Sequence, residues 1–332
     1  MLKTLLGAAA LTAIMAVSAF GADDKPAIVF DIGGKFDKSF NESMFNGSEK
    51  FKTESGIAYG EFEIANEAQR EQAIRNFAEK GNSPIIAAGF AQAEALGKVA
   101  KEYPDLKFVI VDMVVDLPNV QSVVFKEQEG SYLVGMMAAM ASKSGKVGFV
   151  GGMDIPLIHK FACGYAQGAK AAKADATVFQ NMTGDTGAAW NDPVKGGEIT
   201  KGQMAKGADV VYAAAGATGL GVLQAAADGG ALSIGVDANQ NYLHPGKVLT
   251  SMLKRVDVAV YNAMKTGKEG TFKSGIQALG LKEGGVDFAM DDNNKALVTD
   301  DMKAKVEAAK ADIIAGKLLV HDYMEDNKCP VE

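Results

Sequence analysis

The sequence predicts an α/β fold built from two doubly wound, mainly parallel sheets. Short apolar runs of strand length alternate with stretches of helical length and period, an order typical of parallel strands joined by helices. The alternation occurs twice, up to about residue 124 and again from about 126 to 240. No linker rich in Pro, Gly and Ser separates the two series, so we expect two lobes joined by strands that cross over.

Nine apolar runs are candidates for the strands of these sheets. They span residues 27–31, 58–64, 84–89, 107–112, 120–125, 146–152, 176–180, 209–216 and 232–237. We expect residues 22–124 with about 252–280 to form one lobe. We expect residues 125–251 with about 281–332 to form the other.

The last third of the chain is harder to read. Residues 251–267 are interpreted as a helix, and residues 274–290 as a turn-rich hairpin. Thr299 to Ala315 is interpreted as a last helix. The pattern leaves open to which lobe this C-terminal portion belongs.

The first 21 residues have the pattern of a secretory signal peptide. Lys3 is a short positive region, Leu5 to Val17 is apolar, and small residues favour cleavage after Gly21. An uncleaved membrane anchor is the alternative, but the apolar run is short beside the about 20 residues that span a bilayer. No Cys lies at the cleavage site to accept a lipid. We therefore expect a mature protein that is periplasmic.

The chain contains two cysteines, Cys163 and Cys329. Export permits a disulfide. Cys163 lies on a predicted helix and Cys329 in the C-terminal tail, and the sequence does not show whether they meet. A bridge and a buried thiol with a free tail thiol both stay open.

Composition and motifs argue against nucleic acid and against metal or cofactor chemistry. The formal net charge is −7 with a pI of about 5.2, whereas a phosphate backbone calls for clustered Lys and Arg. The histidines, His159, His244 and His321, lack metal-ligand spacing. The glycines of 216–221 (GATGLG) have the wrong spacing for a dinucleotide loop, so we interpret them as close strand-to-helix packing. We expect no metal and no cofactor.

Acids and glycines follow the predicted strands. In open α/β sheets, ligands bind beyond the carboxyl ends of the strands. The acids are Asp31, Asp112, Asp154 and Asp237, and the strands 84–89 and 209–216 end in glycine. A single Asp after a strand is often only a helix N-cap, but together these acids favour a polar crevice.

Two predicted helix starts carry an aromatic residue beside an amide. These pairs are Phe40 with Asn41 and Trp190 with Asn191. Each ring is either a core anchor or one side of a grip on a flat ligand, with one ring from each lobe.

The same two helix starts carry capping signals. Ser39 and Glu42 match the S-x-x-E capping box. At the other start, Asp192 can cap the helix and Pro193 suits its first position. Local turn chemistry therefore explains part of both motifs.

A series of blocks identifies a family. The chain resembles the basic membrane protein (Bmp/Med-type) family of ABC transporter substrate-binding proteins through DIGGKFDKSFNESMFNG, FKEQEGSYLVGMMAA, GKVGFVGGMDIPLIHKFACGYAQGAK, WNDPVKGGEI, AAAGATGLGVLQAA, IGVDANQNYLHPGKVLTSMLKRVDVAVY and GLKEGGV. The resemblance implies the type 1 periplasmic-binding fold, in which two lobes close on a ligand. It implies a purine nucleoside as ligand and a cognate ABC permease in the inner membrane as partner. We expect a monomer and no enzymatic activity.

The resemblance also implies a set of ligand-binding residues: Asp31, Phe40, Asn41, Asp112, Trp190, Gly216, Asp237 and Lys254. Trp190 stands where many relatives have Phe, which keeps a π-face but enlarges it and leaves the preferred base open. Lys254 either contacts the ligand or only pairs with Asp237. Another flat or polyol ligand, such as a nucleobase, a flavin or a sugar, is the first alternative. A nucleoside-cleaving enzyme is disfavoured because no D-x-D cluster lies near the N-terminus.

Overall fold

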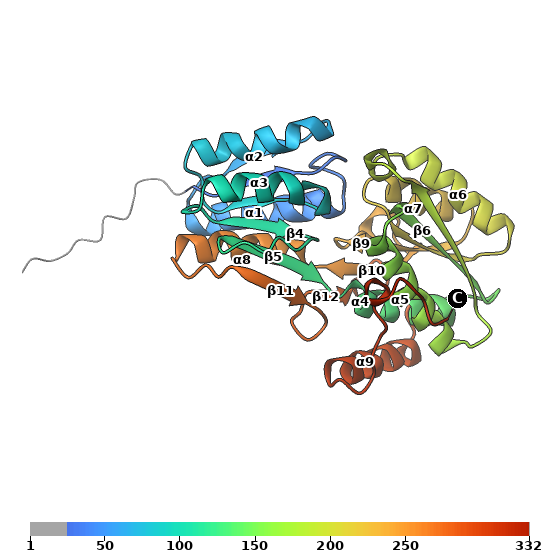
Figure 1. Ribbon diagram of the computed structural model, residues 1–332. Helices are drawn as coiled ribbons and strands as arrows, with labels where there is room; N and C mark the ends of the chain where they lie inside the picture. The colour runs from blue at the N-terminus through green and yellow to red at the C-terminus, as the bar shows by residue number, and fades with distance from the viewer. Residues whose placement is uncertain (1–24, 332) are drawn as a thin grey trace, which may run out of the picture.

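Two six-stranded sheets divide the computed structural model, which describes residues 25–331, into two lobes (Figure 1). We call the half that contains β1 the first lobe and the half that contains β6 the second lobe. This arrangement confirms the predicted α/β class with two doubly wound sheets. The predicted signal peptide lies outside the described residues, and the predicted division of the chain into lobes by residue range stays a prediction.

The two sheets repeat one strand order. The first runs β11-β5-β4-β3-β1-β2 and the second β12-β10-β9-β8-β6-β7. All neighbours are parallel except β12 against β10. The first-sheet strands are β1 (Ala27–Phe30), β2 (Gly60–Glu63), β3 (Ile85–Ala87), β4 (Phe108–Val111), β5 (Val120–Phe125) and β11 (Gly275–Leu279). The second-sheet strands are β6 (Lys146–Met153), β7 (Thr177–Gly184), β8 (Val210–Ala214), β9 (Leu232–Asp237), β10 (Val248–Lys254) and β12 (Val286–Phe288).

Helices cover both faces of each sheet. They are α1 (Phe40–Ser55), α2 (Arg70–Glu79), α3 (Ala93–Glu102), α4 (Glu127–Ala141), α5 (Pro156–Ala172), α6 (Pro193–Ala205), α7 (Thr218–Asp228), α8 (Val256–Lys268) and α9 (Asp300–Ile314). Short 3-10 turns are η1 (Glu67–Gln69), η2 (Phe90–Gln92), η3 (Gly187–Trp190), η4 (Asn241–Leu243) and η5 (Tyr323–Glu325). Within residues 25–331, none of the helices combines the length and apolar character needed to cross a membrane.

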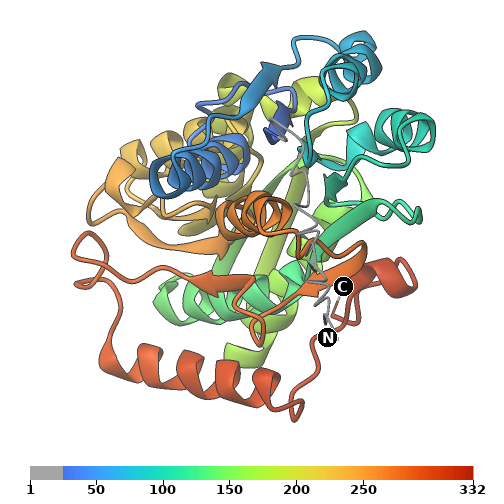
Figure 2. The ribbon, with the colours of Figure 1, turned by 90° about the vertical axis from the view of Figure 1, so that its left-hand side faces the viewer.

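The strand β1 is apolar throughout because it is buried on both of its faces. Ile28 and Phe30 lie in the cluster that includes Met44 of α1 and Val260 of α8. Ala27 and Val29 point to the opposite face, into the cluster under α2 and α3. Successive side chains of a strand alternate between faces, so a strand covered on both sides is apolar throughout. Figure 2 shows α8 beside α1 on one of these faces.

Three crossovers connect the lobes. Lys126 links β5 to α4, Arg255 links β10 to α8, and residues 280–285 link β11 to β12. Backbone bonds tie the crossovers together: Lys126 N–H donates to the Leu279 carbonyl at 3.0 Å, and Arg255 N–H donates to the Gly285 carbonyl at 2.8 Å. The first two crossovers are therefore hydrogen-bonded to the two ends of the third.

Two expectations for the C-terminal third are wrong. Residues 251–254 end the strand β10, and the helix α8 begins only at Val256. The strand was missed because Thr250 and Ser251 are polar, yet both are buried and their hydroxyls bond Ala289 O at 2.8 Å and Asn241 Oδ1 at 2.9 Å. The predicted hairpin 274–290 is a crossover instead, because β11 and β12 join different sheets. The last helix is confirmed as α9.

The glycine-rich segment 216–221 differs in part from its interpretation. A Cβ on Gly221 would lie 1.8 Å from the carbonyl oxygen of Pro193, so this glycine lets α7 approach the start of α6. The tightest approach is therefore between two helices, while the predicted strand-to-helix packing is present at Gly219, where a Cβ would lie 3.5 Å from Cβ of Ala213 in β8.

The C-terminal tail is fastened to α5 in the second lobe. Cys163 and Cys329 form a disulfide, which settles the alternative that the sequence left open. Gln167 accepts from the His321 N–H and donates to the His321 carbonyl, each at 3.0 Å. Lys160 also lies 3.2 Å from the Asp322 carboxylate. One helix therefore holds the tail at three residues spread over about two of its turns.

The helices α4 and α5 touch backbone to backbone, which generates a stability prediction. A Cβ on Gly168 would lie 1.9 Å from the Tyr132 carbonyl oxygen. We expect Gly168→Ala to lower the free energy of unfolding by about 3 kcal/mol, because the helices must move apart. Gly202→Ala is the control: this exposed α6 position has nothing within 4 Å of the added Cβ, so stability should rise by about 0.5–1 kcal/mol. Urea unfolding measures both, and equal effects would contradict the proposed contact.

Candidate functional site

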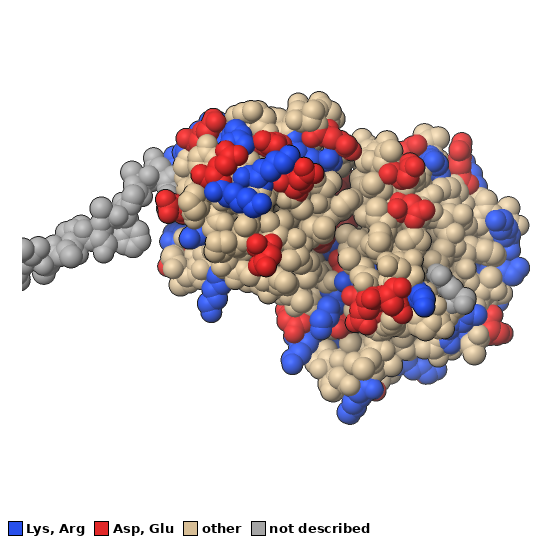
Figure 3. All heavy atoms as spheres, viewed as in Figure 1, with Lys and Arg blue, Asp and Glu red and all other residues tan. Residues whose placement is uncertain are grey.

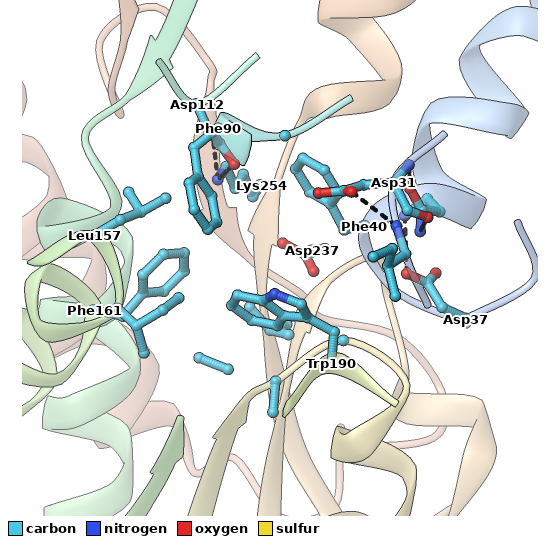
Figure 4. Close-up of a pocket in the computed structure, with 18 residues that line it drawn as sticks. Asp31, Asp37, Phe40, Phe90, Asp112, Leu157, Phe161, Trp190, Asp237 and Lys254 are labelled. Atoms are coloured by element: carbon cyan, nitrogen blue, oxygen red, sulfur yellow. Dashed lines mark hydrogen bonds and ion pairs between the residues drawn. The ribbon is translucent and has the colours of Figure 1, made fainter. Parts of the chain in front are cut away.

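One pocket between the lobes brings together all eight residues predicted for the site (Figure 4). Its empty space, including the part open to solvent, amounts to about 650 Å³. The other lining residues are Ile32, Asp37, Gly89, Phe90, Leu157, Ile158, Phe161, Ala214, Ala215 and Val236. That the eight residues contact a ligand stays a prediction.

The sheet topology explains why these residues meet. Asp31 follows β1 and Asp112 follows β4 in the first lobe. Asp237 and Lys254 are the last residues of β9 and β10 in the second. Carboxyl ends of parallel strands gather at one edge of a sheet, and here both edges face the same cleft. Figure 3 shows the hollow between the lobes, with acidic and basic side chains interspersed on the surrounding face.

Asp154 is the one strand-end acid that stays outside. It is not among the lining residues, and its carboxylate lies 2.7 Å from His159 Nε2 in a partly exposed pair. The position of Asp154 after β6 alone did not indicate this pairing, because its partner His159 lies within the helix α5 that follows.

Four aromatic rings line the pocket, two from each lobe. Phe40 and Phe90 come from the first lobe, and Phe161 and Trp190 from the second (Figure 4). A Cβ on Gly152 would lie 2.2 Å from Cζ3 of Trp190, so the indole lies directly against this glycine of β6. Phe90 and Phe161 were missed. Phe90 follows the glycine that ends a predicted strand, and this position could have indicated a pocket residue. Phe161 could not be found in this way, because one must know which side of the helix α5 faces the pocket.

Lys254 is the buried charge of the site. It is 2% exposed, and its Nζ lies 2.7 Å from the Asp112 carboxylate and 2.9 Å from Glu127 Oε1. The same Nζ lies 5.3 Å from the ring centroid of Phe40 and 5.5 Å from that of Phe161, distances typical of cation–π contacts. The pairing with Asp237 that we considered is replaced by pairing with Asp112 and Glu127.

Glu127 extends this pairing into a line of alternating charges. Its fully buried carboxylate also lies 3.1 Å from Lys160 Nζ, and Lys160 in turn meets Asp322 at 3.2 Å. Burial works against the Lys254 charge, but the carboxylates of Asp112 and Glu127 outweigh it and raise the pKa of Lys254. These carboxylates therefore favour the charged form of the ammonium.

All four carboxylic acids that line the pocket have raised pKa values, and burial raises those of Asp37 and Asp112 to about 6. Burial raises the pKa of Asp237 to about 6, although Lys254 and the Ser39 hydroxyl favour its charged form. Burial also raises the pKa of Asp31, against the Ile32 N–H at 2.8 Å and Arg70 at 3.4 Å. Both carboxylates lie where a ligand could satisfy them.

The first helix is capped by a residue that the sequence reading overlooked. Ser39 is at the N-cap position, but its side chain makes no capping bond. The carboxylate of Asp37 accepts instead from the backbone N–H groups of Ser39, Asn41 and Glu42 at 2.8, 3.0 and 3.0 Å. The predicted capping box is therefore wrong. At the other helix start, Asp192 accepts from Lys195 N–H at 2.9 Å, which confirms the predicted cap.

The side chain of Asn41 is occupied within its own lobe. Its Oδ1 accepts from the Asp31 N–H at 3.2 Å. Its Nδ2 donates to the Asp31 carbonyl at 3.2 Å and to the Gly34 carbonyl at 3.3 Å. Asn41 thus holds the loop that presents Asp31 to the pocket.

Among residues 25–331, no three His, Cys, Asp or Glu side chains are grouped to hold a metal ion.

Comparisons with known proteins point to one family. The Bmp family model, described as ABC transporter substrate-binding protein PnrA-like, matches residues 25–319. The chain is 36% identical over 324 residues to the ABC transporter nucleoside-binding protein BmpA of Lactococcus lactis subsp. cremoris, covering 90% of this chain and 89% of that protein. It is 35% identical over 283 residues to an uncharacterized lipoprotein of Pyrococcus horikoshii, covering 81% and 69%. A crystal structure of an ABC transporter solute-binding protein from Aeropyrum pernix K1 is similar, with a TM-score of 0.81, 30% identity and coverage of 90% and 93%.

The buried pairing of Lys254 predicts a large and pH-dependent loss of stability. Lys254→Met leaves Asp112 and Glu127 buried without their shared cation, so the free energy of unfolding should fall by about 3–5 kcal/mol at pH 7.5. Unpaired buried carboxylates take up protons more readily in the folded state than in the unfolded one, so the loss should be smaller at pH 5. Urea unfolding without ligand at both pH values measures the effect.

The control for this prediction is Lys310→Met. Lys310 lies 2.7 Å from the Asp287 carboxylate, but Asp287 is 38% exposed, so the loss should stay below about 1 kcal/mol. A loss of similar size in the two variants would show that the Lys254 network is not the special case inferred from its burial.

Proposed function

This chain belongs to the Bmp family of ABC transporter substrate-binding proteins, and from that premise we propose that it binds a purine nucleoside between its lobes. The observation that carries the proposal is the pairing of four aromatic rings with buried carboxylates in one interlobe pocket. The name of the Lactococcus relative, a nucleoside-binding protein, supports it. Family membership itself implies a small-molecule ligand, a membrane permease as partner and no enzymatic activity.

The geometry supports a division of labour between rings and acids. We propose that a planar base lies between Phe40 and Trp190, which line the pocket from different lobes. Stacking of a base on an aromatic ring is worth about 1–3 kcal/mol. The carboxylates of Asp31 and Asp237 accept hydrogen bonds from ribose hydroxyl or base N–H groups, at about 1.5–3 kcal/mol each. Asp112 and Lys254 complete the polar wall, and Gly216 brings the backbone close to the ligand.

Transport follows from closure of the lobes. Ligand that contacts both lobes binds the closed form better and shifts the population toward it. The closed form would then be recognised by the cognate ABC permease of the inner membrane. We propose that the protein does this as a monomer.

The place of action is proposed from the N-terminus and the cysteines. A signal peptide cleaved after Gly21 would deliver the chain to the periplasm, where a disulfide is stable. The Pyrococcus relative is named a lipoprotein. In this chain both cysteines are joined in the bridge between Cys163 and Cys329.

Calorimetry with adenosine, guanosine, inosine and their free bases tests the ligand. We expect heat with purine nucleosides and binding at least about tenfold weaker for free bases, which lack the ribose hydroxyls that the acids would hold. No heat or thermal shift with any of them would refute the proposal. Chromatography after long incubation covers the enzyme alternative, because a released base would revive it.

A ring variant discriminates a nucleoside from a sugar. Trp190→Ala should weaken binding about 5- to 150-fold, the equivalent of about 1–3 kcal/mol of stacking. Tyr242→Ala is the matched control, because this ring is 52% exposed and does not line the pocket. Unchanged affinity in Trp190→Ala would favour a polyol ligand.

Affinity should depend on pH through Asp237. Its carboxylate accepts hydrogen bonds only weakly once protonated, and its pKa is raised to about 6 by burial. Ligand that needs the charged form releases the proton on binding, so affinity should rise with pH and level off above about pH 7. We expect binding about tenfold weaker at pH 5 than at pH 7.5.

The Asp237→Asn variant identifies the titrating group in this experiment. It should bind weakly at both pH values and change by less than about threefold between them. Lys254, Asp37, Glu127 and Asp112 are charged groups that interact with Asp237, and burial raises the pKa of Asp37 and of Asp112 to about 6 as well. A tenfold change that persists in Asp237→Asn would assign the titration to another group.

A further inference from the structure

Two neighbouring residues of the first lobe bond directly to the second lobe beside the pocket. The Ser39 hydroxyl donates to the Asp237 carboxylate. The Gln240 Nε2 donates to the Lys38 carbonyl at 2.9 Å. Ser39, Asp237 and Gln240 are 0%, 7% and 1% exposed. We call these four residues the interlobe clasp.

The Ser39 hydroxyl is available for this bond because it does not cap its own helix. A serine at the N-cap usually turns its hydroxyl back onto the backbone of its own helix. Here Asp37 accepts from the three N–H groups at the start of α1, including that of Ser39 itself. The hydroxyl is left to cross to the other lobe. Its only bond partner among the described residues is Asp237.

Gln240 is oriented by its own lobe before it meets the other. Its Oε1 accepts from the Val236 N–H at 2.9 Å, and its backbone N–H donates to Ser251 Oγ at 2.9 Å. Because the Oε1 end of this side-chain amide is held within the second lobe, its NH₂ group points toward the Lys38 carbonyl. A pre-oriented donor loses little freedom when the lobes meet.

The backbone on both sides of the clasp is in the left-handed region. Lys38 has φ +61° and Asp237 has φ +64°. Non-glycine residues adopt this region rarely, and a cluster of them marks a functional arrangement that the surroundings maintain. The two residues supply the two acceptors of the clasp, so the unusual backbone and the interlobe bonds coincide.

The clasp also separates two spaces. Asp237 lines the pocket on one side and, on the other, a second cavity whose empty space, again including the part open to solvent, is about 770 Å³. Lys38 lines that second cavity, with Tyr242 and Arg255. Moving Lys38 and Ser39 away from the second lobe would join the cavity to the pocket and admit water to the ligand.

We propose that the clasp holds the lobes together in the ligand-free protein and thereby sets the affinity of the pocket. The covalent links between the lobes lie elsewhere, at the three crossovers, so opening of the cleft must break both clasp bonds. Apparent affinity scales with the fraction of molecules in the binding-competent form. The affinity part rests on the proposed function, whereas the lobe-holding part does not.

The test compares Ser39→Ala and Gln240→Leu with the wild type and with Ser48→Ala. Ser48 is a fully buried serine of the same helix α1, and its hydroxyl bonds the Met44 carbonyl within that helix. Small-angle scattering without ligand should show a larger radius of gyration for both clasp variants, and amide exchange in residues 36–43 and 237–243 should accelerate about tenfold. Ser48→Ala should match the wild type in both measurements.

Binding supplies the second readout. With a purine nucleoside that binds the wild type, each clasp variant should bind about tenfold more weakly. Unchanged scattering and exchange in both variants would overturn the clasp, even if affinity fell, because Ser39 would then only orient Asp237. Changed scattering with no nucleoside bound by any protein, wild type included, would support the clasp and refute the proposed function instead.

Discussion

The site depends on one buried ammonium group. Lys254 ends the last parallel strand of the second sheet, at a crossover, and its Nζ meets Asp112 of the first lobe and Glu127 at the start of α4. A charge that is 2% exposed is tolerated only when it is paired and bonded. The requirement therefore draws together a strand end of one lobe, a helix start of the other and a crossover between them. The pocket forms around this junction.

The repeated strand order makes such a junction possible. The order in which the strands are added reverses at the same place in each sheet, between β1 and β3 in the first and between β6 and β8 in the second. Ligand sites in doubly wound sheets lie at that reversal. Two sheets facing each other double the number of strand ends available. Acids from one sheet can then oppose rings from the other, with neither sheet having to supply a whole site.

Much of this could be predicted from the sequence, because strand-end positions are visible as residues that follow apolar runs. Asp31, Asp112 and Asp237 were found in this way, and all three line the pocket. Phe161 and the pairing of Lys254 with Glu127 were not found. They depend on the rotation of a helix and on which crossover lies beside which strand, and neither leaves a local pattern. The strand β10 was missed because its buried hydroxyls look like surface residues until their partners are known.

The local rules that fail are concentrated at the seam between the lobes. The N-terminus of α1 is capped by Asp37 rather than by the serine at its N-cap position, and three non-glycine residues at the seam, Lys38, Asp112 and Asp237, adopt left-handed backbone. A sequence whose local preferences all agreed would hold each lobe well but would leave no unsatisfied donor for the other lobe. Departures of this kind are expected where function competes with folding. In this protein the bonding capacity released within one lobe is used between the lobes, on the carboxylate of Asp237, which we also propose as a ligand contact.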